Sequence, residues 1–226
     1  MGRPVIPLLL ARDPSEPVKV TCLGAHCDDI EIGCGGTLLA LREQFPHLEM
    51  RWLILSSDEV RAGEARASAA RFGVEDVSKQ VQVETFRDGY LPYEGAAVKQ
   101  AIHDHRGTFE PDVVFTHYRD DRHQDHRMVS DVTWNAYRDH LVLEYEIPKW
   151  DGDVGVPNVF MPLSENQVET KLDILYDTYV SQHEKDWFQP NAFRGLMAVR
   201  GVEARAPSGY AEAFHARKLV LASTRS

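Results

Sequence analysis

The alternation of short apolar runs with helical segments is the feature that most limits the folds open to this chain of 226 residues. Apolar runs with the length and composition of buried strands lie at 18–24, 51–56, 81–86, 112–116 and 142–147. Segments with helical spacing of apolar residues separate them, at 37–45, 61–72, 96–105 and 125–140. This order is typical of a parallel sheet with helices on both faces and right-handed crossovers. We therefore predict an α/β fold, a Rossmann-like three-layer sandwich with a mostly parallel sheet.

The C-terminal third follows a less regular pattern. Residues 150–162 are rich in Gly, Pro and Asp and predict a loop, and a long helix is predicted at 165–179. A final strand is predicted at 211–221, after a Pro-Ser-Gly turn. A hydrophobic content of 43% is ample for one core. We expect a single domain over 1–226, in which the part at about 150–210 lies on the substrate side and varies with the substrate.

Charge and composition exclude several classes of partner. The formal net charge is -10 and the pI is about 5.4, so we expect neither nucleic acid nor an anionic membrane surface as a partner. No apolar run approaches the ~20 residues that span a bilayer, and the apolar run near the start is too short for a secretory signal. Cys22, Cys27 and Cys34 are odd in number and fit reduced thiols better than disulfides. We expect a cytoplasmic protein.

The most informative motif is Ala-His-Cys-Asp-Asp at 25–29, where the first apolar strand ends. In open α/β sheets, sites are built outside the carboxyl ends of the strands. A histidine followed three residues later by an aspartate, here His26 and Asp29, supplies two good Zn²⁺ ligands. Residues 33–36 (Gly-Cys-Gly-Gly) predict a glycine-rich turn, but they lack the spacing of a dinucleotide fingerprint.

A second cluster, His-Gln-Asp-His at 123–126, follows the apolar strand at 112–116 and offers a third ligand. His26, Asp29 and His126 would form a face with one open position, which is typical of catalytic zinc and not of structural zinc. Fe²⁺ is the alternative metal. A His-x-x-Asp turn taken alone is more often ordinary capping chemistry. Two metal-like clusters at two strand ends together favour a metal site.

These two motifs resemble those of the PIG-L/LmbE-like zinc deacetylases, which remove acyl groups from amino sugars and related amides. The resemblance also includes Phe-Arg-Asp-Gly at 86–89 and Pro-Asp-Val-Val-Phe-Thr-His at 111–117, and it covers roughly residues 18 to 140. Cys27 stands where the commonest family form has proline. The resemblance implies a metal-dependent hydrolase with the same sandwich fold.

Three residues are candidates for catalytic roles beside the metal. Hydrolysis needs a proton acceptor, and Asp28 is adjacent to the ligand Asp29 but would point the other way in an extended turn; the resemblance implies the same role of general base. His123 lies three residues before His126, so on a helical turn it would share that face and either stabilise the oxyanion or protonate the leaving amine. Asp125 is predicted to support these groups or to cap the helix.

Four further residues are candidates for contact with substrate. Arg61 opens a predicted helix where the related enzymes place an arginine that contacts sugar hydroxyls, although its spacing alone fits an exposed face. Asp88 ends the third strand. His117 ends the strand before the second cluster and would either line the pocket or pack at the strand end. Arg194 lies in a segment rich in aromatic residues, for which core packing is the alternative.

The preferred hypothesis is a zinc-dependent N-deacetylase whose partner is a small-molecule amino sugar or glycoconjugate. The alternatives are a non-catalytic metal-binding or sugar-binding module and an amidase acting on a non-sugar N-acyl substrate. A metal phosphoesterase usually needs two ions and therefore more ligands than the three assigned here. A homo-oligomer is left open by the sequence.

Overall fold

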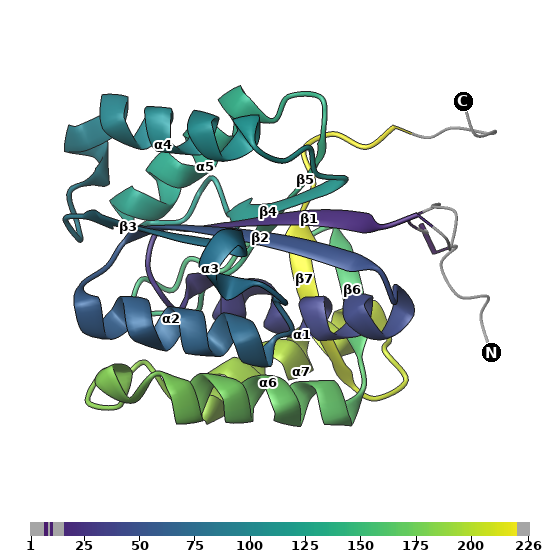
Figure 1. The fold of residues 1–226 in the computed structure, drawn as a ribbon. Helices are drawn as coiled ribbons and strands as arrows, with labels where there is room; N and C mark the ends of the chain where they lie inside the picture. The colour runs from purple at the N-terminus through teal and green to yellow at the C-terminus, as the bar shows by residue number, and fades with distance from the viewer. Residues whose placement is uncertain (1–6, 9, 11–15, 221–226) are drawn as a thin grey trace.

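A seven-stranded sheet forms the middle layer of the protein (Figure 1), and its strand order is β3-β2-β1-β4-β5-β7-β6. The computed structural model describes residues 7, 8, 10 and 16–220. Strands β1 to β5 pair in parallel with one another, whereas β7 is antiparallel to both β5 and β6. The predicted α/β sandwich with a mostly parallel sheet is confirmed. The strands are β1 (Val18–Gly24), β2 (Leu48–Ser56), β3 (Val81–Phe86), β4 (Val113–His117), β5 (Leu141–Tyr145), β6 (Val159–Leu163) and β7 (Tyr210–His215).

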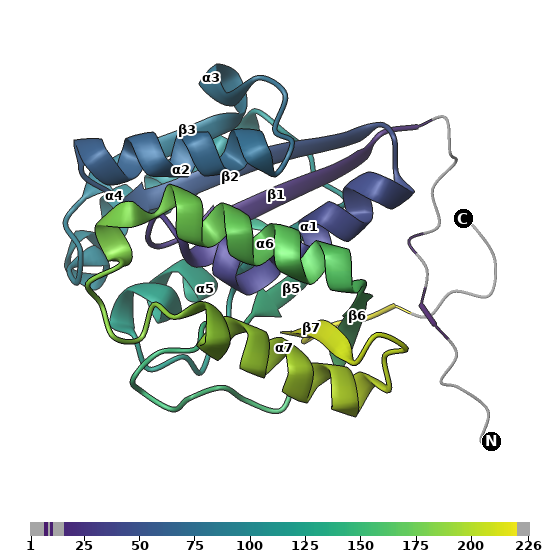
Figure 2. The same cartoon turned by 90° about the horizontal axis from the view of Figure 1, so that it is seen from below.

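Helices cover both faces of this sheet (Figures 1 and 2). One face carries α4 (Gly95–Gly107) and α5 (Gln124–Ala136). The other carries α1 (Asp29–Gln44) and α2 (Glu59–Arg71), with α6 (Glu165–Thr178) and α7 (Pro190–Ala204) beside them. The short helices are α3 (Val77–Gln80) and the 3-10 turns η1 (Leu91–Glu94) and η2 (Val180–Gln182). Within the described part of the chain, no helix is both long enough and apolar enough to cross a membrane.

Two apolar clusters form the core, one on each face of the sheet. Trp52 belongs to the cluster under α1 and α2, while its neighbour Leu53 belongs to the cluster under α4 and α5. This division follows from the pleat of a strand, which sends successive side chains to opposite faces. Residues 52–55 of β2 are buried on both faces and form a continuous apolar run, as in other parallel sheets, whereas Glu49 and Arg51 lie in its less buried first half.

The predicted glycine-rich turn at 33–36 is wrong, because these residues lie inside α1, which begins at Asp29 and not at residue 37. A Cβ atom on Gly33 would lie 2.2 Å from a ring carbon of Tyr145 on β5, and one on Gly36 would lie 2.5 Å from Leu163 on β6. The glycines are therefore needed for the close approach of α1 to the sheet.

The remaining differences lie at element ends and in the C-terminal third. The predicted loop at 150–162 ends in strand β6, and α7 was not predicted, although Pro190 at its start is a common first helical residue. The helix predicted at 125–140 ends at Ala136. The final strand runs from Tyr210 to His215, and residue 221 of the predicted strand lies outside the described residues. In the segment 1–10, where a secretory signal was considered, residues 1–6 and 9 also lie outside them.

Candidate metal centre and active site

Both predicted metal clusters lie at the carboxyl edge of the sheet. β1 and β4 pair in parallel, so the segment that follows β1 and the segment that follows β4 leave the sheet side by side. The first segment carries His26 and leads into α1, and the second leads into α5, which carries His126. Residues almost a hundred positions apart are brought together by this pairing, as the crevice rule for open α/β sheets predicts.

Three side chains converge closely at this edge. His126 Nε2 lies 3.3 Å from His26 Nδ1 and 3.5 Å from Asp29 Oδ1. His26 Nδ1 lies 3.3 Å from Asp29 Oδ2. All three residues are buried, and their ligand atoms are close enough to share one ion. The metal ligands proposed from the sequence therefore form one compact group.

The neighbours of the two histidines indicate which nitrogen of each faces the group. His126 Nδ1 lies 2.9 Å from Asp121 Oδ2, which accepts its hydrogen and leaves a lone pair on Nε2. His26 Nε2 lies 3.1 Å from Asp88 Oδ1 and 3.4 Å from Asp125 Oδ2 but has no hydrogen-bond partner of good geometry among the described residues. Burial opposes the protonation of His26, but Asp29, Asp125 and Asp88 outweigh it and raise the pKa of the imidazole. A bound divalent cation would replace the proton on Nδ1, which faces the Asp29 carboxylate and Nε2 of His126. This set fits a divalent cation, and His-Asp-His suits Zn²⁺.

Asp121 and Lys149 support His126, and the sequence analysis assigned neither of them to the site. Asp121 Oδ1 lies 2.9 Å from Lys149 Nζ and accepts the backbone N–H of His123 at 2.7 Å. Burial opposes the ionisation of Asp121, but His126 and Lys149 outweigh it and hold the pKa of this carboxyl below its usual range. Lys149 Nζ also lies 2.6 Å from Asp153 Oδ2. The only signal in the sequence was an aspartate two residues before the His-x-Asp-His motif.

Asp28, the predicted general base, is buried and lines a cavity together with His26, Asp29 and His126. Its Oδ1 accepts a hydrogen bond of 2.9 Å from Arg61 Nη2, and its Oδ2 has no hydrogen-bond partner within the described residues. Burial raises the pKa of Asp28, Arg61 opposes this effect, and the adjacent Asp29 adds to it. A carboxylate with one free oxygen and a raised pKa is suited to accept a proton.

Cys27, which lies between His26 and Asp28 in the chain, faces away from the metal group. Its Sγ lies 3.7 Å from the carbonyl oxygen of Ser56, and burial raises the pKa of the thiol to about 12. Zinc is bound by the thiolate and not by the thiol. The residue that replaces the family's usual proline therefore packs in the core as a neutral group.

His123 is the N-cap residue of α5, and its Nδ1 accepts the backbone N–H of Asp125 at 3.3 Å. In the neutral imidazole the hydrogen therefore sits on Nε2, which can act as a donor. Burial lowers the pKa of His123, and His26, whose ring centroid is 4.9 Å away, lowers it further. Neutral His123 is the form that follows at pH 7.

Asp125 is fully buried and holds the turn that carries Asp88. Its two carboxylate oxygens accept the backbone N–H groups of Gly89 at 2.7 Å and Leu91 at 3.1 Å. Its Oδ2 also faces His26 Nε2. The supporting role expected of Asp125 has this geometric basis, whereas the alternative role as helix cap belongs to His123 in this structure.

The four candidate substrate residues lie in different surroundings. Arg61 and Asp88 line the cavity, and contact with His26 lowers the pKa of Asp88 to about 2. His117 is buried beneath the site, where its ring stacks on His126 and its Nε2 accepts the backbone N–H of Ala25 at 2.9 Å. Arg194 lies on α7 outside the lining residues and pairs with Glu169 at 2.5 Å. Contact of these residues with substrate stays a prediction.

The cavity above the metal group has a volume of ≈ 190 Å³. Its inner wall consists of His26, Asp28, Asp29, Arg61, Asp88, His123 and His126. Its outer wall comes from two segments of the C-terminal third, 147–151 after β5 and 182–187 after α6. The segment 182–187 and the end of 147–151 fall within the part at about 150–210 that the sequence analysis assigned to the substrate side, whereas Ile147 and Lys149 precede it. The outer residues are Ile147, Lys149, Trp150, Asp151, Gln182, Lys185 and Trp187.

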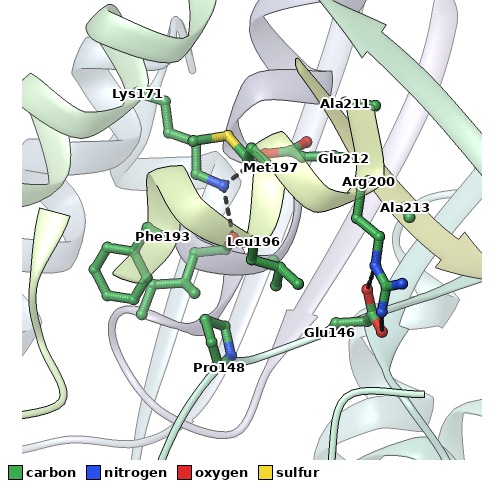
Figure 3. Close-up of a pocket in the computed structure, with 12 residues that line it drawn as sticks. Glu146, Pro148, Lys171, Phe193, Leu196, Met197, Arg200, Ala211, Glu212 and Ala213 are labelled. Atoms are coloured by element: carbon green, nitrogen blue, oxygen red, sulfur yellow. Dashed lines mark hydrogen bonds and ion pairs between the residues drawn. The ribbon is translucent and has the colours of Figure 1, made fainter. Parts of the chain in front are cut away.

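A second, much smaller cavity lies between α7 and the sheet and shares no lining residue with the first (Figure 3). Its charged side chains are already paired. Lys171 Nζ lies 2.6 Å from Glu212 Oε1, and Arg200 binds Glu146 through two nitrogens at 2.6 and 2.8 Å. These buried ion pairs tie α6 and α7 to the sheet, and they leave no unpaired charge to bind a ligand.

This chain is similar to known proteins in both sequence and structure. Residues 21–137 match the family model of PIG-L, described as GlcNAc-PI de-N-acetylase. An N,N'-diacetylchitobiose deacetylase from Pyrococcus horikoshii is similar in structure, with a TM-score of 0.69 and 22% identity over 88% of this chain and 83% of that chain. The teicoplanin deacetylase Orf2, solved in a zinc-inhibited form, gives a TM-score of 0.67 and 14% identity over 88% and 97%.

One structural neighbour has a different activity. The 4-carboxy-2-hydroxymuconate hydratase GalB from Pseudomonas putida KT2440 gives a TM-score of 0.68 and 17% identity over 92% of this chain and 100% of that chain. At these identities the neighbours establish a shared fold. Since a hydratase and deacetylases share it, the reaction has to be argued from the site itself.

Proposed function

The chain belongs to the PIG-L family, and from this premise we propose that it is a metal-dependent hydrolase that removes the acetyl or acyl group from an N-acetylated amino sugar or glycoconjugate. The observation that carries the proposal is the convergence of a His-Asp-His group, a free carboxylate oxygen on Asp28 and a neutral His123 around one cavity. The metal site, a proton acceptor and a hydrogen-bond donor are the parts that amide hydrolysis requires.

In this proposal His26, Asp29 and His126 hold Zn²⁺, with Fe²⁺ as the alternative. When bound, the ion supplies a Lewis acid that acidifies water and polarises the acyl carbonyl. Asp121 keeps His126 in the tautomer that can bind it, and Asp88 and Asp125 lie beside Nε2 of His26, where they would accept its hydrogen once Nδ1 holds the ion.

Asp28 accepts the proton of the attacking water through its free oxygen, while Arg61 holds the other oxygen and fixes the orientation of the carboxylate. The water oxygen bonds to the acyl carbon and the C–N bond breaks. Asp28 then returns the proton to the departing nitrogen, so the products are a carboxylic acid and a free amine, and transfer of the acid's proton to the amine leaves a carboxylate and an ammonium group. The raised pKa of Asp28 suits a group that must first accept and then release a proton.

His123 donates a hydrogen bond through Nε2 to the oxygen of the acyl group, on which negative charge develops. Because burial and the neighbouring His26 lower its pKa, His123 does this as the neutral imidazole. A single donor of this kind is worth about 10²–10³ in rate.

Three alternatives are less well supported. A phosphoesterase would need two separate ligand sets, whereas the candidate groups within the described residues share His26 or His126 and form one cluster. A hydratase shares the fold, but the family model that matches this chain describes a de-N-acetylase. A binding module without turnover gives no reason for Asp28 to keep a free, buried carboxylate oxygen beside the metal group.

The test is a comparison of substrates with the purified, Zn²⁺-loaded protein. N-acetylglucosamine derivatives, simple N-acyl amino acids, phosphodiesters and unsaturated dicarboxylic acids are supplied side by side. Free amine released from the sugars supports the proposal. Amine released only from amino acids, cleavage of phosphodiesters, or hydration of the unsaturated acids would each contradict it.

A further inference from the structure

The outer wall of the cavity carries an exposed aromatic residue that the proposed chemistry does not use. Trp150 lines the same cavity as the metal group, yet it is 70% exposed. Trp187 lies beside it, with the ring centroids 6.0 Å apart in an edge-to-face arrangement. Large aromatic side chains that face solvent at a cavity mouth are typical of binding sites.

Trp150 is held in place on both sides. Its Nε1 donates a hydrogen bond of 2.9 Å to Asp186 Oδ1, which belongs to the other outer segment. The preceding residue, Lys149, has a nearly buried side chain that binds Asp121 and Asp153. An indole fixed in this way loses little freedom when a ligand stacks on it, so its contact area is available at low entropic cost.

Polar groups of mixed charge surround the two indoles. Asp151 and Lys185 also line the cavity, and Lys185 Nζ lies 6.0 Å from the centre of the Trp187 ring. Neither sign of charge dominates this wall, which argues against a subsite built for an ion. An apolar face with polar side chains around it matches a neutral sugar. The C–H face of the sugar packs on an indole while its hydroxyls bind the polar groups.

Gln182 provides an independent sign that this wall binds a polar ligand. Its side chain is 3% exposed, and its Nε2 donates to Ser181 Oγ at 2.9 Å. The Ser181 hydroxyl is itself committed to Glu64 at 2.6 Å, so the amide cannot be reversed without losing a hydrogen bond. Gln182 Oε1 is therefore left as a buried acceptor with no donor among the described residues. Such an acceptor is costly unless a ligand, for example a sugar hydroxyl, satisfies it.

We infer that Trp150, Trp187 and Gln182 form a subsite for a second pyranose ring, linked to the ring that bears the N-acyl group. The inference rests on the proposed function and narrows it: the substrate is an amino sugar joined to another sugar, and not a free monosaccharide. Stacking on a fixed indole is expected to raise kcat/KM for a two-ring substrate about tenfold over its one-ring counterpart.

The experiment compares three substrates on the full-length, Zn²⁺-loaded enzyme. They are the methyl glycoside of N-acetylglucosamine, a β-1,4-linked disaccharide of N-acetylglucosamine, and the phenyl glycoside of N-acetylglucosamine. The expected result is a preference of about tenfold for the disaccharide. In Trp150→Ala this ratio should fall toward one, and Trp150→Phe should restore part of it. Tyr93→Ala removes an aromatic residue that is 77% exposed outside the cavity, and it should keep the wild-type ratio.

Equal kcat/KM for one and two rings in the wild type, or an unchanged ratio in Trp150→Ala, would overturn the inference. A preference for the phenyl glycoside alone would also overturn it, because the wall would then select an aromatic group. If no N-acetyl sugar is cleaved, the proposed function is contradicted and the subsite is tested separately. Quenching of tryptophan fluorescence then measures the binding of cellobiose and of glucose. Tighter binding of cellobiose to the wild type than to Trp150→Ala supports the subsite, and equal binding to both proteins rejects it.

Discussion

His126 Nδ1 donates a hydrogen bond of 2.9 Å to Asp121 Oδ2, so one buried carboxylate determines which nitrogen of a proposed metal ligand faces the cavity. Asp121 is in turn fixed by Lys149, which reaches it from the segment that also carries Trp150. Carboxylates in this position orient histidine ligands and increase their basicity. The binding of metal and the shape of the outer cavity wall therefore depend on a shared set of contacts.

The first prediction is that Asp121→Asn weakens Zn²⁺ binding about 10- to 100-fold, because the amide cannot replace the charge that holds His126 and Lys149. Competition with a chromophoric chelator measures the affinity. Asp120→Asn is the matched control, since Asp120 is an exposed neighbour that faces Arg119 and not the metal group, and it should bind Zn²⁺ as the wild type does. Equal affinities in all three proteins would show that Asp121 does not position the ligand.

The second prediction separates catalysis from metal binding. Asp28→Asn should keep a full equivalent of Zn²⁺ and lose about 10²–10⁴ in kcat, because an amide cannot accept the proton of water. Elemental analysis and a free-amine assay give the two readouts. Asp58→Asn, which alters an exposed helix-capping carboxylate, should retain activity close to that of the wild type. A near-normal kcat in Asp28→Asn would remove this residue from the mechanism.

Much of the fold and the inner site follows from local signals in the sequence. The apolar runs of β1 and β4 have the signature of buried parallel strands, and parallel strands present their carboxyl ends at one edge of the sheet. Two short motifs placed after such strands are therefore expected at the same edge, and the family resemblance pointed to the same residues. The pairing of β1 with β4, which the sequence does not specify, brings His26 and His126 into contact.

Other features depend on contacts between distant residues and leave no local signal. Gly33 and Gly36 suggested a turn because a helix rarely contains so many glycines, but the need for them arises from Tyr145 and Leu163, more than a hundred residues away. Asp121 looked like an ordinary loop residue because Lys149, its partner, lies in another segment. Strand β6 pairs only with β7 among the described strands, which is a weak constraint on its sequence.

The third prediction tests the close approach of α1 to the sheet. Gly33→Ala should lower the free energy of unfolding by about 1–3 kcal/mol, because the added methyl group meets the buried ring of Tyr145, whose hydroxyl is held by the carbonyl of Leu23. Gly63→Ala in α2 is the control. Among the described residues, no atom outside its own stretch of helix lies within 4 Å of its added Cβ, so this change should stabilise the protein by about 0.5–1 kcal/mol. Urea unfolding measures both, and a shift of the same sign in the two variants would contradict the packing argument.

The last prediction concerns His105, a buried residue of α4 that belongs neither to the candidate metal-binding groups nor to the lining of the cavity above them. Burial and, to a smaller extent, the charge of Arg51 lower the pKa of His105 to about 4, whereas an unfolded histidine has a pKa near 6.5. Between these values the unfolded chain binds a proton that the folded chain does not, so stability rises with pH. The contribution of neutral His105 to the free energy of unfolding is complete above about pH 6.5 and is lost as the pH falls through about 4. Its upper limit is about 3 kcal/mol. His105→Gln should therefore flatten the pH dependence of the unfolding free energy between pH 4.5 and 7, measured by urea unfolding in the presence of a chelator. His47→Gln, at an exposed histidine, should keep the wild-type slope, and an unaltered slope in His105→Gln would show that His105 is not the buried neutral group that the structure places there.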